Sequence, residues 1–333
     1  MLTVVTGATG HIGGNLVRAL LAEGRKVRCV VWCEDKDTAA LDGLDVERVY
    51  GDVRDIESLK AAFAGADVVY HLASRISIVG PEGGLVRAIN VQGAANVAEA
   101  CLSCGVRRLV HFSSIHARNI NTDLDKPVDE TRERSWGKGT PAYDISKGDG
   151  ELKVLDAVSR GLDAVIVCPT GVIGPLDFKL SRMGTVFLGL ARGKLPGGVV
   201  GGFDWVDARD VASAAIAAEK KGRTGELYLL GGHYVPFIEL AKRFEKVCGR
   251  PAPKFMCPMW LARAVAPFAL FISQHSSIPP LFTPESLNAL RANHDIRHDK
   301  AARELGYNPR PFDESLVDIY NWFVEAGLVK KEK

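Results

Sequence analysis

The segment GATGHIGG, residues 7–14, follows the short apolar run LTVVT and precedes a helical pattern of apolar residues. Its glycines Gly7, Gly10 and Gly13 lack a Cβ, so the chain can turn tightly there and a helix can pack close to a strand. The backbone N–H groups in the first turn of that helix would face an anion. This order of strand, turn and helix predicts a βα unit that binds the pyrophosphate of a dinucleotide.

Short apolar runs separated by helical patterns continue through the first half of the chain. They are VRCVVW, VERVY, DVVYHLA, RLVHFSS and DAVIVCP. This alternation is typical of a parallel sheet covered on both faces by helices. We therefore expect an α/β fold, a Rossmann doubly wound parallel sheet with a smaller, interleaved C-terminal substrate lobe. Because glycine and proline become frequent after Pro169, we expect the sheet domain at 1–168 plus about 204–231, and the lobe at 169–203 plus about 232–333.

Charge and hydropathy narrow the range of partners. With 42 basic and 40 acidic residues the net charge is +2, which is too even to indicate binding to nucleic acid or to an anionic membrane. The most apolar stretch, 258–272, is too short to span a bilayer and contains Arg263 and Pro267. We expect it to be a helix that lines a hydrophobic pocket.

The seven cysteines show neither a disulfide framework nor metal-ligand spacing. Cys101 and Cys104 form one C-x-x-C within a helical pattern, and a structural role is expected for both. The pattern predicts no metal site and a reducing compartment, and since no signal segment precedes the first strand, the cytoplasm is the expected location.

Tyr143 and Lys147 in the segment YDISK stand four residues apart, on one face of the helix expected there. Together with the Gly-x-x-Gly-x-x-Gly spacing, this pair resembles the short-chain dehydrogenase/reductase superfamily. The similarity points to its extended branch, the NAD-dependent epimerase/dehydratase family, and within it to the dihydroflavonol reductase and 3β-hydroxysteroid dehydrogenase-like group. The resemblance implies a catalytic set of Ser114, Tyr143 and Lys147, with Ser113 as the alternative serine.

This set has a chemical rationale. Hydride transfer to a carbonyl leaves an alkoxide that must be protonated, and Tyr143 is the expected acid. The Lys147 ammonium is expected to lower the pKa of Tyr143, and Ser114 to donate a second hydrogen bond to the substrate oxygen. His116 fits either a substrate contact or a partly exposed loop residue. Asp207 and Asp210 lie farther along the chain, and we expect them to anchor a loop or cap a helix.

The resemblance also implies which residues contact the NAD(P) cofactor: Gly7, Thr9, Gly10, His11, Ile12, Gly13, Trp32, Asp52, Val53, Leu72, Ala73, Ser74, Asn90, Tyr143, Lys147, Pro169, Thr170, Gly171 and Val172. NAD and NADP are normally distinguished about 20 residues beyond the glycines. There Val31 and Trp32 provide neither an acid for the ribose nor an arginine for the 2′-phosphate. Glu34 and Asp35 would repel a phosphate and Lys36 would attract one, which on balance favours NAD.

The substrate class is less constrained. No Asn follows Pro169, Cys168 replaces an Arg common in nucleotide-sugar epimerases, and Arg291 and Arg297 are loose candidates for gripping a diphosphate. An apolar cavity could be walled by Phe187, Leu188, Leu190, Trp260, Phe268 and Phe271, although these residues also fit an ordinary core.

The leading hypothesis is therefore reversible oxidation and reduction of a secondary alcohol and ketone on a small, fairly hydrophobic molecule. The alternatives are a nucleotide-sugar epimerase or dehydratase with tightly bound NAD, and a regulatory protein that binds the dinucleotide without turnover. By resemblance, the helices expected at 85–104 and 143–159 pair into a homodimer interface.

Overall fold

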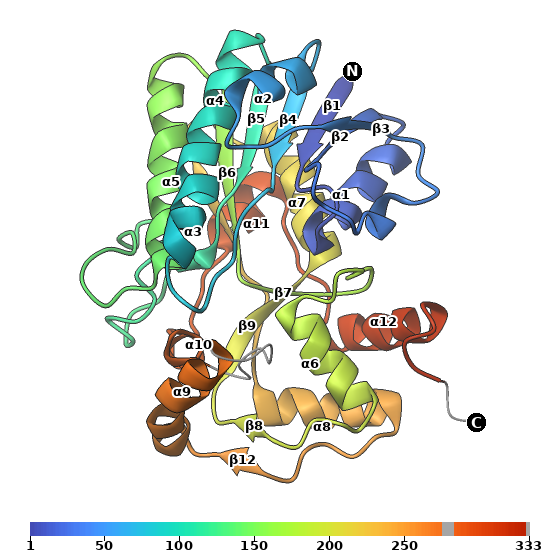
Figure 1. Ribbon diagram of the computed structural model, residues 1–333, viewed down its shortest axis with the longest axis vertical. Helices are drawn as coiled ribbons and strands as arrows, with labels where there is room; N and C mark the ends of the chain where they lie inside the picture. The colour runs from blue at the N-terminus through green and yellow to red at the C-terminus, as the bar shows by residue number, and fades with distance from the viewer. Residues whose placement is uncertain (275–282, 331–333) are drawn as a thin grey trace.

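A seven-stranded parallel sheet forms the upper part of the molecule (Figure 1). The computed structural model describes residues 1–274 and 283–330, with the side chains of 269–274 excepted. Strand order is β10-β6-β5-β4-β1-β2-β3 and every neighbouring pair is parallel. The strands are β1 (Leu2–Thr6), β2 (Lys26–Val31), β3 (Glu47–Tyr50), β4 (Val68–His71), β5 (Arg108–Phe112), β6 (Ala164–Pro169) and β10 (Leu227–Leu230). The doubly wound α/β fold expected from the sequence is confirmed.

Helices cover both faces of this sheet because successive strand residues point to opposite sides. Val5 packs in one core with α1 (His11–Ala22), α7 (Ala208–Lys221) and α11 (Asp299–Leu305). Val4 packs in the other core with α2 (Ile56–Phe63), α4 (Gly93–Ser103) and α5 (Ala142–Ser159). Before α4, the short α3 (Leu85–Arg87) continues into a π-helical turn, η3 (Ala88–Gln92). Three 3₁₀ turns complete this part, η1 (Ala39–Leu41), η2 (Glu82–Gly84) and η4 (Ile115–Ala117).

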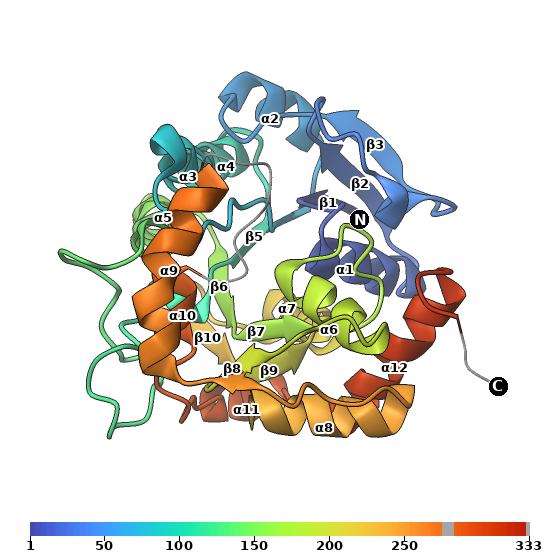
Figure 2. The ribbon, with the colours of Figure 1, turned by 60° about the horizontal axis from the view of Figure 1, so that its bottom comes forward.

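A second, smaller sheet lies below the first, as Figure 2 shows from beneath. It has the order β11-β9-β7, built from β7 (Gly171–Ile173), β9 (Gly202–Asp207) and β11 (His233–Pro236), and β8 (Gly198–Val199) pairs separately with β12 (Met256–Cys257). Around it, α6 (Arg182–Ala191), α8 (Phe237–Cys248) and α12 (Phe312–Glu325) form a third core. The expected division into a sheet domain and a C-terminal lobe stays a proposal. Ala301, Leu305 and Tyr307 fall within the range expected for the lobe, but they pack in a core of the large sheet.

The apolar stretch 258–272 is helical, within α9 (Met259–Gln274), and lies beside α10 (Pro284–Ala289). Its Ala262 and Ala266 pack on Leu287, while Trp260 and Phe268 are each 71% exposed. Trp260 and Phe268 therefore face away from the small core, the side chain of Phe271 lies outside the described residues, and the expectation that this helix lines a pocket stays a prediction. In residues 1–274 and 283–330, every helix is too short or too polar to cross a membrane.

Candidate active site

The glycine turn after β1 is a cradle that larger residues would fill. Gly7 has φ +71°, and a Cβ there would lie 2.6 Å from the backbone nitrogen of Ala73. A Cβ on Gly13 would clash with the Gly7 carbonyl oxygen and lie 2.8 Å from Ala8 Cα. Among the described residues, no side chain caps the start of α1, and its first turn holds no acid. Its N–H groups are therefore free to bind an anion, so the turn fits the pyrophosphate of a dinucleotide.

The loop after β4 runs beside this turn. The backbone N–H groups of Leu72 and Ala73 donate to the backbone carbonyl and the hydroxyl of Thr6, at 3.1 and 3.3 Å. Ser74 Oγ donates to Asn90 Oδ1 at 3.0 Å, and Asn90 Nδ2 donates to Ser146 Oγ on α5 at 2.9 Å. Asn90 thus ties the loop to α5, with both ends of its amide bonded within the protein.

Trp32 and Asp52, which were both expected to contact the cofactor, both lie next to Arg54. Trp32 is 43% exposed and lies under the Arg54 guanidinium, whose carbon is 5.9 Å from the ring centroid. Arg54 Nε donates to Asp52 Oδ1 at 3.0 Å, and hydrogen bonds from Arg54 lower the pKa of Asp52. Asp52 is therefore neutralised by Arg54, which covers the ring of Trp32.

Asp35 and Lys179 were not assigned to the site from the sequence. A turn from the Asp35 N–H to the Trp32 carbonyl, 2.9 Å, brings the Asp35 carboxylate back to the glycine turn. There it accepts from Thr9 Oγ1 at 2.7 Å and from Lys179 Nζ at 2.7 Å. Asp35 was considered only as a charge that would repel a phosphate, and nothing local marked Lys179, which is 144 residues away from it in the chain.

The two serines after β5 have different partners. Ser113 Oγ donates to the buried Glu151 Oε1 at 2.6 Å. Ser114 Oγ accepts from the His116 N–H at 3.2 Å, and the Ser114 hydroxyl is close enough to the Tyr143 phenol to lower the pKa of that phenol. Between the two candidates, Ser114 is therefore the serine that lies against Tyr143.

Helix α5 presents Tyr143 in its first turn and Lys147 one turn later. Lys147 is buried, and its Nζ donates to the carbonyl oxygen of Phe112 at the end of β5, at 2.7 Å. Ser114, Tyr143 and Lys147 thus converge at the carboxyl end of β5, the edge where open α/β sheets bind ligands.

The expected effect of Lys147 on Tyr143 is wrong for this structure. The pKa of Tyr143 is raised to about 12, mainly by burial, with the Ser114 hydroxyl opposing the rise and the Asp144 carboxylate adding to it. The Lys147 ammonium is directed to the Phe112 carbonyl, and burial lowers the pKa of Lys147 to about 8. Tyr143 is consequently a neutral phenol at pH 7, the form that donates a proton.

Burial of Lys147 gives a pH-dependent prediction. An unfolded lysine keeps a pKa of 10.5, so between about pH 8 and 10.5 the unfolded chain binds more protons than the folded protein. The free energy of unfolding of the wild type, relative to Lys147→Met, should therefore increase by about 3 kcal/mol over this pH range. Urea unfolding of both proteins at several pH values measures it. A constant difference would contradict the burial of a charged amine.

A cavity of about 130 Å³ lies next to the site. Its lining is mostly apolar: Ile115, His116, Ile120, Thr170, Gly171, Met183, Gly202, Phe203, Asp204, Trp205, Tyr234, Ala289, Ala292, Asn293 and Ile296. His116 lines this cavity and also lies beside Tyr143, since the centroids of the two rings are 5.8 Å apart. Its Nδ1 also lies 3.2 Å from Asp144 Oδ1, although not in hydrogen-bonding geometry. Burial raises the pKa of Asp204, whose carboxylate accepts from the Gly232 N–H at 2.7 Å.

Of the two possibilities for the apolar residues of α6, an ordinary core is the one observed, although Phe187 also borders a small cavity of about 10 Å³. Phe187, Leu188 and Leu190 face the third core, because α6 packs on α8 and α12, and Trp260 and Phe268 are exposed. The side chain of Phe271 lies outside the described residues.

The arginines considered for binding a diphosphate do not line the cavity, whereas the two aspartates have the anchoring role that was expected. Arg291 and Arg297 are both exposed, and Arg297 Nε pairs with Asp295 at 2.8 Å. Among the described residues that line the cavity, none is an arginine or a lysine. Asp207 caps α7 through the Arg209 N–H at 2.8 Å, and Asp210 pairs with Arg310, as expected of an anchoring role.

A doubly wound sheet, a glycine turn after its first strand, and Ser114, Tyr143 and Lys147 at the carboxyl end of β5 are together typical of a dinucleotide-dependent enzyme. Residues 3–231 match the model of the NAD dependent epimerase/dehydratase family, and the chain belongs to that family. It is an NAD(P)-dependent oxidoreductase of the extended short-chain dehydrogenase/reductase type. The resemblance to the dihydroflavonol reductase and 3β-hydroxysteroid dehydrogenase-like group is confirmed.

Two relatives and one solved structure extend over nearly the whole chain. Sterol demethylase protein B of Methylococcus capsulatus is 36% identical, over 99% of this chain and 100% of the relative. A putative dihydroflavonol 4-reductase of Synechocystis sp. is 30% identical, over 98% of this chain and 96% of the relative. The crystal structure of gox2253 superposes with a TM-score of 0.84 and 31% identity, over 99% of each chain.

Proposed function

We propose that the protein interconverts a secondary alcohol and a ketone on a small, fairly hydrophobic substrate, with Ser114, Tyr143 and Lys147 as catalytic residues. The observation that carries this proposal is that Ser114, rather than Ser113, lies against Tyr143 beside a mostly apolar cavity. Two relatives named for a sterol and a dihydroflavonol also support a largely apolar substrate that contains rings.

The nicotinamide of the bound cofactor would supply or accept the hydride. In the reductive direction, Tyr143 donates its proton to the developing alkoxide, and Ser114 donates a hydrogen bond to the same oxygen. The Lys147 ammonium is available to the hydroxyls of the nicotinamide ribose. The glycine turn would hold the pyrophosphate, and the cofactor is NAD(P), with a lean to NAD.

A panel of ketones that includes dihydroflavonols and 3-ketosteroids, assayed with NADH and with NADPH, tests this function. We expect turnover of at least one apolar ketone, followed as loss of absorbance of the reduced cofactor. Tightly held NAD after purification, together with a thermal shift on addition of UDP and no ketone turnover, would instead indicate a nucleotide-sugar epimerase or dehydratase. Dinucleotide binding without any turnover would indicate a regulatory protein.

We also propose a homodimer formed through α4 and α5, which lie side by side on one face of the sheet (Figure 1). Leu152 on α5 is 48% exposed, as expected of a residue that a partner covers. Light scattering at micromolar concentration should give twice the chain mass, and a monomer mass would contradict the proposal. A cytoplasmic location is proposed from the seven free thiols, and cell fractionation tests it.

A further inference from the structure

The loop of residues 174–180, between β7 and α6, lies along the start of α1. The carbonyl oxygen of Pro175 accepts from His11 Nε2 at 3.0 Å and from Asn15 Nδ2 at 3.2 Å. One turn farther along α1, the Arg18 guanidinium carbon is 5.5 Å from the ring centroid of Phe178. These contacts bring a loop of the smaller sheet against the helix that follows the glycine turn.

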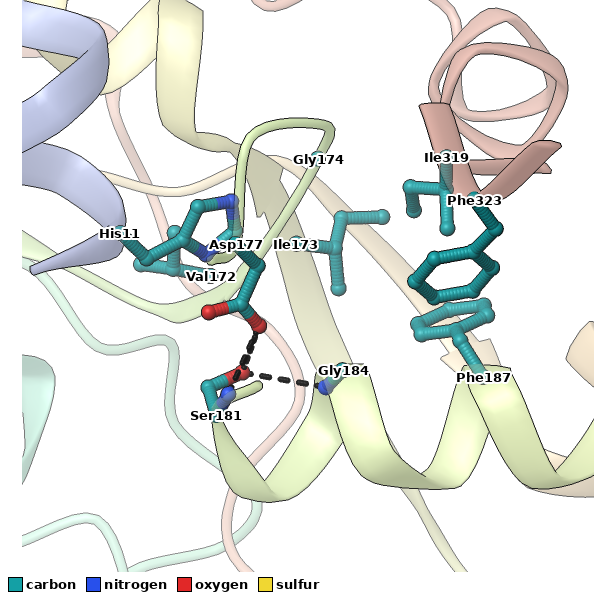
Figure 3. Close-up of a pocket in the computed structure, with 10 residues that line it drawn as sticks. All are labelled: His11, Val172, Ile173, Gly174, Asp177, Ser181, Gly184, Phe187, Ile319 and Phe323. Carbon is teal, nitrogen blue, oxygen red and sulfur yellow. Dashed lines mark hydrogen bonds between the residues drawn. The ribbon is translucent and has the colours of Figure 1, made fainter. Parts of the chain in front are cut away.

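The same loop is fixed internally. Leu176 and Leu180 have φ values of +65° and +47°, a left-handed conformation that side chains other than glycine adopt only when their surroundings impose it. Asp177 is buried and accepts from the Ser181 N–H and hydroxyl at 2.8 and 2.6 Å, and Ser181 Oγ accepts from the Gly184 N–H at 3.0 Å (Figure 3). The cavity behind these residues is only about 10 Å³. The loop therefore holds Lys179 in place.

Lys179 reaches from this loop to the glycine turn. Its Nζ is 2.8 and 2.7 Å from the two carboxylate oxygens of Asp35 and 3.0 Å from Thr9 Oγ1. Burial alone would raise the pKa of Asp35, but hydrogen bonds from Lys179 and Thr9 outweigh it and lower the pKa. Asp35 is therefore ionised at neutral pH, with its charge matched by the Lys179 ammonium.

The position of the Asp35–Lys179 pair corresponds to the adenosine ribose of a dinucleotide. With the pyrophosphate at the start of α1, the adenosine ribose extends from the glycine turn toward the end of β2. The Thr9–Asp35 hydrogen bond joins those two places, so it marks the level of the ribose. An unpaired carboxylate at that level would accept the ribose hydroxyls of NAD and repel the 2′-phosphate of NADP.

Resting on the proposed function, we propose that Lys179 is a specificity-determining residue that admits NADP beside NAD. Its ammonium balances the charge of Asp35 and can also pair with a 2′-phosphate. With NAD, Asp35 accepts a ribose hydroxyl while Lys179 stays paired to it. With NADP, the phosphate shares the ammonium with Asp35.

Titration calorimetry of the full-length protein with NADH and with NADPH tests this. We expect the wild type to bind both within about tenfold of each other. Lys179→Gln should weaken NADPH by about tenfold or more and change NADH by less than about threefold, because one charge-assisted contact is lost with NADPH alone. Asp35→Asn, which frees the ammonium, should tighten NADPH by about tenfold. The control is Lys242→Gln, an exposed lysine on α8 with no part in either proposed binding site, which should change neither affinity.

Three results would overturn the inference. Lys179→Gln could weaken both dinucleotides equally or neither of them, or Lys242→Gln could reproduce its effect on NADPH. Melting curves of each variant show that any loss of binding is not loss of fold. A wild type that binds neither dinucleotide would overturn the proposed function as well, whereas binding of both without a selective effect of Lys179→Gln would overturn this inference alone.

Discussion

Tyr143→Phe should fold and bind the dinucleotide as the wild type does, and lose turnover by a factor of about 10² to 10⁴. The substitution removes only the phenolic oxygen, the group that lies against Ser114 and that would donate the proton. The ring stays, so its edge-on contact with His116 is kept. Steady-state reduction of a ketone found in the substrate panel measures the loss, and dinucleotide titration checks binding.

Tyr50→Phe is the matched control, since Tyr50 is 76% exposed at the end of β3 and the same oxygen is removed there. It should retain wild-type turnover. Full activity in Tyr143→Phe would remove Tyr143 as the acid. A loss of dinucleotide binding as large as the loss of turnover would assign Tyr143 to binding the cofactor instead.

Glu151→Gln should lower the free energy of unfolding by about 3 to 5 kcal/mol. Glu151 is fully buried on α5, and its carboxylate accepts from Arg118, from Arg134 Nε at 3.1 Å and from Ser113 Oγ at 2.6 Å. A neutral amide there would leave the buried Arg118 guanidinium without a compensating charge.

Urea unfolding at pH 7 measures this effect. Glu57→Gln on α2 is the control, because its side chain is 73% exposed and pairs only with Lys60 one turn away, an arrangement that contributes less than about 1 kcal/mol. A loss below about 1 kcal/mol in Glu151→Gln would show that Arg118 finds another partner or water when the carboxylate is absent.

The features that could be predicted from the sequence depend on neighbours in the chain. Apolar runs of strand length located the strands β1 to β6 of the large sheet, and glycine spacing located the turn after β1. The four-residue spacing of Tyr143 and Lys147 placed both on α5. Each of these patterns reflects the local geometry of a strand, a turn or a helix.

The features that could not be predicted depend on contacts between distant segments. Lys179 meets Thr9 across 170 residues, and no local pattern announces that contact. The apolar residues of α6 have the same helical spacing whether they face a core or a cavity, so the sequence could not decide between these two environments for Phe187. The short strands β11 and β12 were missed because proline and glycine beside them resemble loops.

Lys179 and Met183 stand on either side of the first residue of α6, one touching the glycine turn and the other lining the cavity. The two ligands of this enzyme would therefore meet the same short segment of chain. Thermodynamic linkage then requires that any coupling between the two binding sites through this segment be reciprocal. A substrate that raises the affinity for the dinucleotide by some factor must itself be bound more tightly, by that same factor, once the dinucleotide is in place.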